Sequence, residues 1–232
     1  RDFEDLYKGV TRDDSLPGVH REAAGAALYQ QAIDLLVRAQ RAFLDSRDER
    51  GEAVEQQCIC WRRRFDRRTL RWELDHYLEW GVGARQGDEV LEEVREEFDP
   101  RFDTLVDELL ELPQLVSLRD YQSRNLMYKP RLDVDTPWFI IDFQDALVAP
   151  MVYDLVALLR DSYVELAPET VSELLGYYLE AGELSELPWC VGEDADDQVS
   201  RAFHLQTVQR KLKDAGRFVF IDREKDNPDF LP

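Results

Sequence analysis

The amino-acid sequence predicts an α+β fold that is mainly helical and contains one small β-hairpin element. Through most of the chain, apolar residues recur at the three-to-four-residue spacing of amphipathic helices. In the middle, short apolar runs bounded by turn-forming residues replace that spacing. Hydrophobic residues make up 44% of the 232 residues and charged residues 34%, which is typical of a globular protein and not of a disordered chain.

Four helices are expected before the β-hairpin element. They cover residues 21–45, 67–80, 88–98 and 102–112. We expect Asp99 and Pro100 to separate the last two, because proline lacks the amide hydrogen that a helix interior needs. The only glycine cluster, Gly81–Gly87, follows a helix instead of a strand, so it is predicted to be a loop and not a phosphate-binding motif.

Short strands are predicted in the middle of the chain. They are the apolar runs at residues 115–118, 126–129 and 138–141. The connection from Pro130 to Pro137 is rich in aspartate and proline and suits a hairpin loop. Helical spacing then resumes, and three further helices are expected. They cover residues 152–161, 169–181 and 196–215.

The charge balance and the cysteines limit the classes of partner. The chain has 29 basic and 49 acidic residues, a net charge of −20, which opposes binding to the phosphates of nucleic acids. The basic cluster between Arg62 and Arg68 alternates with apolar residues and is interpreted as a solvated face.

No apolar run approaches the roughly 18 residues of a membrane span. Cys58 and Cys60 are expected to point to different sides of a helix, as reduced thiols of a cytoplasmic protein.

The candidate chemistry lies in two segments, Ser117–Asn125 and Ile140–Asp145. Asp120 is predicted on a loop directly after a strand, where its carboxylate could accept a proton from a hydroxyl group. Asn125 opens the next strand, and the hairpin returns Asp142 to its side. Amide and carboxylate oxygens are the ligands that magnesium prefers, as phosphoryl transfer requires. The alternative is that these residues only form turns and a helix cap.

Four stretches of the sequence together resemble the aminoglycoside phosphotransferase-type kinases. They are Arg119–Met127, Ile141–Ala146, Tyr153–Leu155 and Leu159–Tyr163. More narrowly, the chain is similar to bacterial kinases that phosphorylate the anomeric hydroxyl of N-acetylmuramate and N-acetylglucosamine in cell-wall recycling. Trp72–Tyr77 and Gln209–Lys213 extend this similarity.

The resemblance implies the C-terminal lobe of a protein-kinase-like fold, with the hairpin carrying the catalytic loop. It implies ATP and Mg²⁺ as cofactors and a small-molecule acceptor, an amino-sugar. Asp120 would be the catalytic base, and Asn125 and Asp142 the metal ligands. Arg119 and Asp154 would support the catalytic loop, Asp154 from a helix start through backbone N–H groups.

The resemblance also implies a nucleotide site. Phe3–Leu6 resembles the hinge at which the two lobes of such kinases join. The residues expected to bind the nucleotide are Glu4 and Leu6 in the hinge, with Met127 and Ile141 as the apolar floor under the adenine. The family usually has histidine before Arg119, whereas this chain has Leu118, which would fill the same apolar space and could weaken activity.

The expected domain organisation follows from the same resemblance. Residues 1–17 would be a hinge or linker from a missing N-terminal lobe, and residues 18–232 the C-terminal lobe. Within that lobe we expect a helical part at 18–112, the catalytic loop and hairpin at 113–150, and a helical part at 151–232. Nothing before Asp120 supplies a glycine-rich loop on strands with its lysine, so these residues alone are expected to be inactive.

The acceptor is the least constrained part of the prediction. Glu73, Asp75 and Asp145 are candidate acceptor-binding residues, with a solvated helix face as the alternative for the first two. An aminoglycoside-type antibiotic phosphotransferase and a pseudokinase that binds nucleotide without transfer are the alternative functions. The intact set of Asp120, Asn125 and Asp142 counts against the pseudokinase.

Overall fold

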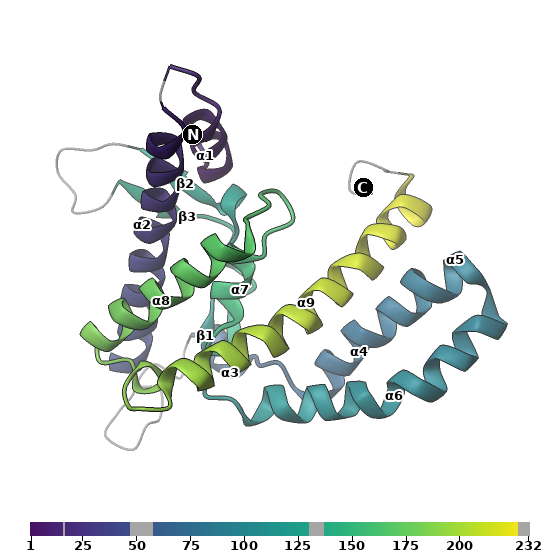
Figure 1. Cartoon of the computed structure of the whole chain (residues 1–232). Helices are drawn as coiled ribbons and strands as arrows, with labels where there is room; N and C mark the ends of the chain where they lie inside the picture. The colour runs from purple at the N-terminus through teal and green to yellow at the C-terminus, as the bar shows by residue number, and fades with distance from the viewer. Residues whose placement is uncertain (16, 47–57, 130–136, 227–232) are drawn as a thin grey trace. The chain divides into compact units, whose positions relative to one another are not determined.

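The computed structural model describes residues 1–15, 17–46, 58–129 and 137–226 (Figure 1). The chain divides into two compact units, each made from two separate stretches of sequence. The first unit comprises residues 1–64 and 114–203, and the second comprises residues 65–113 and 204–232. The helical part expected at 18–112 is therefore shared between the two units. The expected hairpin loop at 130–136 lies outside the described residues.

The helices of the first unit surround a core of aromatic and aliphatic side chains. They are α1 (Phe3–Thr11), α2 (Gly18–Asp45), α3 (Ile59–Arg62), α7 (Tyr153–Leu159) and α8 (Pro168–Leu184), with the start of α9 (Ala195–Lys225). α2 packs against both α1 and α8 (Figure 1). Two buried polar side chains between the helices are paired, since Tyr178 donates a hydrogen bond to Gln40 and Gln40 donates to the carbonyl of Met151. This pairing removes the cost of burying them.

Two antiparallel strand pairs are embedded among these helices. β2 (Leu126–Tyr128) pairs with β3 (Trp138–Ile140), which confirms the predicted hairpin. β1 (Gln114–Ser117) pairs with β4 (Leu147–Pro150). β4 was not predicted, because its residues belong to a continuous apolar run that reads equally well as a buried strand or a helix. The prediction of a mainly helical protein with a small antiparallel element is confirmed.

The second unit contains α4 (Arg67–Tyr77), a π-helical segment (Leu78–Gly83), α5 (Ala84–Gln86) and α6 (Asp88–Glu111), with the later part of α9. The predicted loop at Gly81–Gly87 is wrong, because the chain stays helical until Gln86 and turns only at Gly87, where φ is 95°. A Cβ on Gly81 would lie 2.7 Å from the ring of Tyr77, so glycine is there for close packing and not for a turn.

The predicted break at Asp99 and Pro100 is also wrong, because α6 is continuous with Pro100 inside it. An interior proline costs a helix about 3 kcal/mol. Two interactions offset this cost. Phe102 and Val106 on the following turns are buried, and α6 packs against α4. Arg71 of α4 donates a hydrogen bond to the Asp99 carbonyl at 3.1 Å and forms an ion pair with its carboxylate.

Cys58 and Cys60 do not point to different sides as predicted. Cys58 precedes α3 instead of lying on it, so its sulfur turns back to within 2.9 Å of the Cys60 sulfur. Both are free thiols, and burial together with the hydrogen bond to Cys58 raises the pKa of Cys60 to about 11. In the part of the chain that the structure describes, no helix combines the length and the apolar character needed to cross a membrane.

Two glycines of α8 test the packing of the first unit. A Cβ on Gly182 would lie 2.9 Å from the Cβ of Cys190 and closer still to its sulfur, whereas no described heavy atom lies within 4 Å of a Cβ on Gly176. We expect Gly182→Ala to destabilise the protein by about 1–3 kcal/mol through overpacking. Gly176→Ala, the matched control, should stabilise it by up to about 1 kcal/mol through helix propensity.

The measurement is the free energy of unfolding of both variants by urea denaturation. Equal stabilisation by both substitutions would show that α8 does not pack on the Cys190 segment in this way.

Candidate active site

A buried carboxylate fixes the loop that follows β1. Asp154 lies in the first turn of α7 and is only 4% exposed. Its Oδ2 accepts a hydrogen bond from the backbone N–H of Leu118 at 2.7 Å, and its Oδ1 accepts from the N–H of Arg119 at 3.0 Å and from the hydroxyl of Ser117 at 2.7 Å. These are the contacts that the resemblance implies for Asp154. A carboxylate bonded this way holds the backbone of the loop in one conformation.

The backbone of Arg119 is in a conformation that L-residues rarely adopt. Its φ is +71°, and the Asp120 N–H donates a hydrogen bond to the Leu118 carbonyl at 2.9 Å across it, which makes a tight γ-turn. Such a residue costs about 1–3 kcal/mol and persists only where surrounding contacts hold it. The hydrogen bonds to Asp154 supply those contacts. Asp120 follows the turn with a partly exposed side chain.

Hydrogen bonds connect Asn125 both to Asp120 and to Ile141, the residue before Asp142. The side-chain amide of Asn125 donates a hydrogen bond to the carbonyl of Asp120 at 2.8 Å. The N–H of Ile141 donates to the carbonyl of Asn125 at 3.0 Å, so Asp142 emerges directly beside it. Asp142 itself has a φ of +60° and accepts a hydrogen bond from Gln144 at 2.5 Å. Backbone strain thus recurs at both predicted functional loops.

These residues fit a magnesium ion held together with phosphates. Mg²⁺ is usually bound by one or two carboxylates or amide oxygens, with water and substrate phosphates completing six ligands. Asn125 uses its nitrogen on Asp120, and its side-chain oxygen has no hydrogen-bond partner among the described residues. Asp142 supplies an exposed carboxylate. The described residues contain no cluster of three or more His, Cys, Asp or Glu that would form a complete cage by itself.

The four residues predicted to bind nucleotide fall into two groups. Met127 on β2 is partly exposed and Ile141 is 45% exposed, so both present apolar surface that the core does not use. Glu4 and Leu6 instead lie in the first turns of α1, which begins because Asp2 caps it by accepting the N–H of Asp5 at 2.7 Å.

The segment expected as a hinge is therefore helical, and the extended residues precede it. Asp2 forms a β-bridge with Met127, and the Tyr128 N–H donates to the Arg1 carbonyl at 2.7 Å. The carboxylate of Glu4 is occupied by Arg124 and Lys8. Contact of Glu4 or Leu6 with the nucleotide stays a prediction.

The three predicted acceptor residues have different surroundings. Asp145 is exposed and lies 3.6 Å from Arg63 and 3.9 Å from Arg119. In the second unit, Glu73 is buried and accepts a hydrogen bond from Gln209 at 2.5 Å, so the alternative of a solvated helix face is wrong for this residue. Asp75 forms ion pairs with Arg71 at 3.1 Å and with Arg95 at 3.2 Å. Contact of any of the three with an acceptor stays a prediction.

Sequence reasoning missed several residues that hold the loop. Asp161 accepts a hydrogen bond from the Ser123 N–H at 2.8 Å, and Arg124 bonds to Glu4 at 2.6 Å. Asp161 lies inside the segment that carries the family resemblance, which was the only available signal. The side chain of Leu118 takes no part in this anchoring, because Leu118 contributes through its backbone N–H, which any residue except proline provides.

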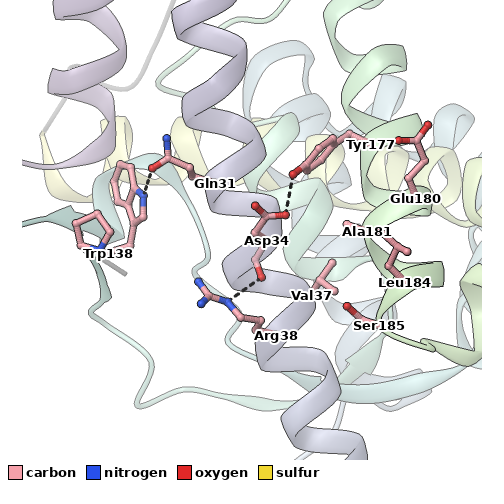
Figure 2. A pocket seen from close by; sticks show the side chains of 11 residues that line it. Gln31, Asp34, Val37, Arg38, Trp138, Tyr177, Glu180, Ala181, Leu184 and Ser185 are labelled. Carbon is pink, nitrogen blue, oxygen red and sulfur yellow. Dashed lines mark hydrogen bonds between the residues drawn. The ribbon is translucent and has the colours of Figure 1, made fainter. Parts of the chain in front are cut away.

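A separate cavity of about 560 Å³ opens between α2 and α8 of the first unit (Figure 2). Asp34 lines this cavity and accepts a hydrogen bond from the Tyr177 hydroxyl at 2.9 Å, while the Trp138 indole donates to Gln31 at 3.0 Å. None of the predicted catalytic or metal-binding residues lines this cavity. It is therefore distinct from the candidate active site.

The role of Asp154 can be tested by removing its charge alone. In Asp154→Asn, one oxygen becomes an N–H donor facing the backbone donors of Leu118 and Arg119, so a buried donor is left unpaired. We expect a loss of about 2–4 kcal/mol in the free energy of unfolding. Ser117→Ala, the comparison variant, loses the bond to the same carboxylate and the bond that its hydroxyl accepts from the Arg119 N–H, which keeps its bond to Asp154. It should cost about 1–2 kcal/mol.

Hydrogen exchange localises the effect of these substitutions. Amides of residues 118–123 should exchange faster in Asp154→Asn than in Ser117→Ala, while those of α2 keep the same protection relative to global stability. Unchanged exchange in the loop would contradict the anchoring role.

Comparison with known proteins identifies the family of the chain. An N-acetylmuramate/N-acetylglucosamine kinase of Neisseria meningitidis serogroup B is 37% identical over 197 residues, which is 85% of this chain and 52% of the relative. Kinases of the same name from Pseudomonas putida and Pseudomonas aeruginosa are 29% and 32% identical, over 88% and 72% of this chain and 54% and 47% of their own length. The chain spans about half the length of the curated relatives it matches. Residues 4–190 match the model of the phosphotransferase enzyme family, and the chain belongs to that family.

Proposed function

We propose that the full-length protein is an ATP- and Mg²⁺-dependent kinase that phosphorylates the anomeric hydroxyl of an N-acetylated amino-sugar. The observation that carries the proposal is the bonded arrangement of Asp120, Asn125 and Asp142. Asn125 bonds to the backbone of Asp120, and its own backbone bonds to the residue before Asp142. Phosphoryl transfer needs an acceptor-side carboxylate next to metal-binding oxygens, and this arrangement supplies both.

Each residue has a separate task in this proposal. Asp120 would orient the attacking hydroxyl and accept its proton as the bond from that oxygen to the γ-phosphorus of ATP forms and the bond from that phosphorus to the leaving ADP breaks. The side-chain oxygen of Asn125 and the carboxylate of Asp142 would hold the metal. When bound, ATP with Mg²⁺ supplies the phosphoryl group and offsets the charge that develops on it. Met127 and Ile141 offer exposed apolar surface suited to the adenine.

The amino-sugar acceptor rests on the relatives named N-acetylmuramate/N-acetylglucosamine kinase. A place in cell-wall recycling and a cytoplasmic location belong to the same proposal. The intact set of Asp120, Asn125 and Asp142 favours a catalyst over a pseudokinase. The strained backbone at Arg119 and Asp142 does not separate the two, because it is typical of catalytic sites and of ligand-binding sites alike.

The first test changes Asp120 to asparagine in the full-length protein. Turnover should fall at least ~100-fold, because the group that accepts the proton is lost. Nucleotide affinity should stay within about threefold, since Asp120 faces the acceptor and not the phosphates. Asp45→Asn, the same change at an exposed carboxylate of α2, is the control.

Turnover is measured by ADP release with N-acetylglucosamine, N-acetylmuramate and an aminoglycoside, and nucleotide binding by calorimetry. Near-normal turnover of a folded Asp120→Asn variant would contradict the assignment. Preference of the unmodified protein for the aminoglycoside would replace the proposed acceptor.

A further inference from the structure

Arg124, the residue before the proposed metal ligand Asn125, makes contacts on two sides. Its Nε donates a hydrogen bond to Oε2 of Glu4 at 2.6 Å, across 120 residues of sequence. Its guanidinium carbon lies 3.7 Å from the centre of the Tyr163 ring, a close cation–π contact. Arg124 is therefore held between α1 and the segment that follows α7.

The surroundings of Glu4 favour a strong bond to this arginine. Its side chain is almost buried, and its two oxygens are divided between two cations, Oε1 to Lys8 and Oε2 to Arg124. Burial alone would raise the pKa of Glu4, but the hydrogen bonds from Arg124 and Lys8 lower it below its ordinary value. The side chain of Glu4 is 11% exposed and that of Arg124 is 49% exposed, so the pair is partly buried and should contribute more than a fully exposed ion pair.

The turn that carries Arg124 leaves it little freedom. Ser123–Asn125 is a single 3-10 turn, and Asp161 accepts the N–H of Ser123 at 2.8 Å. α1 contacts both this turn and β2. The Glu4–Arg124 pair therefore joins α1 to the turn directly before Asn125, whose side chain would have to face the metal.

We propose that Glu4 and Arg124 are positioning residues that orient Asn125 for metal binding. This inference rests on the proposed function, in which Asn125 is a magnesium ligand. Residues behind a metal ligand commonly change affinity by 10–100-fold when removed, because they fix the direction of the ligand. Glu4 then acts on the metal through Arg124 and not as a contact of the nucleotide.

The alternative is that the pair only stabilises the fold, and metal affinity distinguishes the two roles. Binding of Mn²⁺, as a spectroscopic substitute for Mg²⁺, is measured by electron paramagnetic resonance on the full-length protein with a non-hydrolysable ATP analogue. The temperature is kept well below each variant's melting point. We expect Glu4→Gln and Arg124→Gln each to weaken Mn²⁺ binding about tenfold. The double variant should be no weaker than either single variant, because both changes remove one interaction.

The matched control is Lys8→Gln, which breaks the other ion pair of Glu4 without touching the turn. It should leave Mn²⁺ affinity unchanged. Arg124→Lys keeps the positive charge but loses the planar guanidinium with its several N–H donors. It should therefore bind Mn²⁺ more tightly than Arg124→Gln but less tightly than the unmodified protein. If Arg124→Gln does not fold, Arg124→Lys and Glu4→Gln still test the positioning role.

Asn125→Ala and Asp142→Ala separate failure of the inference from failure of the proposed function. If both weaken Mn²⁺ binding and Glu4→Gln and Arg124→Lys do not, the positioning role is overturned and the metal site stands. If neither alanine variant weakens binding, the proposed metal site fails and the positioning role fails with it. An effect of Lys8→Gln equal to that of Glu4→Gln would also overturn the inference, because it would show a general loss of stability.

Discussion

The candidate site depends on one buried carboxylate, that of Asp154. A charge this far from water is tolerated only when hydrogen bonds satisfy it, and here they come from two backbone N–H groups and a hydroxyl. Those bonds hold Arg119 in a conformation that it would otherwise leave. The direction of Asp120, and through it the bond from Asn125, follows from that turn.

A second acid completes the support from the other end of the same helix. α7 is buried along its whole length, with Asp154 in its first turn and Asp161 two residues after its end. Asp154 holds the start of the loop at Leu118, and Asp161 holds its far end at Ser123. The rigid helix thus fixes the distance between the two ends of the loop. The proposed function needs a base and two metal ligands placed within a fraction of an ångström, and such a scaffold suits that need.

The sequence predicted the parts of the fold that local pattern determines. The hairpin was predictable because both strands are short, apolar and separated by turn residues. Pro100 and Gly81 were misread, because local propensity argued for breaks where packing on α4 and against Tyr77 decided the outcome. β4 was missed because its apolar run has no distinguishing period.

In the candidate site, too, the contacts that are local in sequence were predicted and those between distant residues were not. The order and spacing of Asp120, Asn125 and Asp142 were enough to predict that the chain connects them, because the loop and hairpin are local in sequence. Their catalytic and metal-binding roles stay predictions. The pair of Glu4 and Arg124 joins residues 120 positions apart, and no spacing rule connects them. Glu73 was weighed as an exposed residue because a charge on a helix is usually solvated, but the structure buries it against Gln209.

The most direct test is a crystal structure of the full-length protein with Mg²⁺, a non-hydrolysable ATP analogue and N-acetylglucosamine. Our account predicts the side-chain oxygen of Asn125 and the carboxylate of Asp142 at about 2.1 Å from the metal. It also predicts the anomeric hydroxyl within about 3 Å of the Asp120 carboxylate. A metal held without Asn125 and Asp142, or a sugar bound with its anomeric hydroxyl away from Asp120, would contradict it.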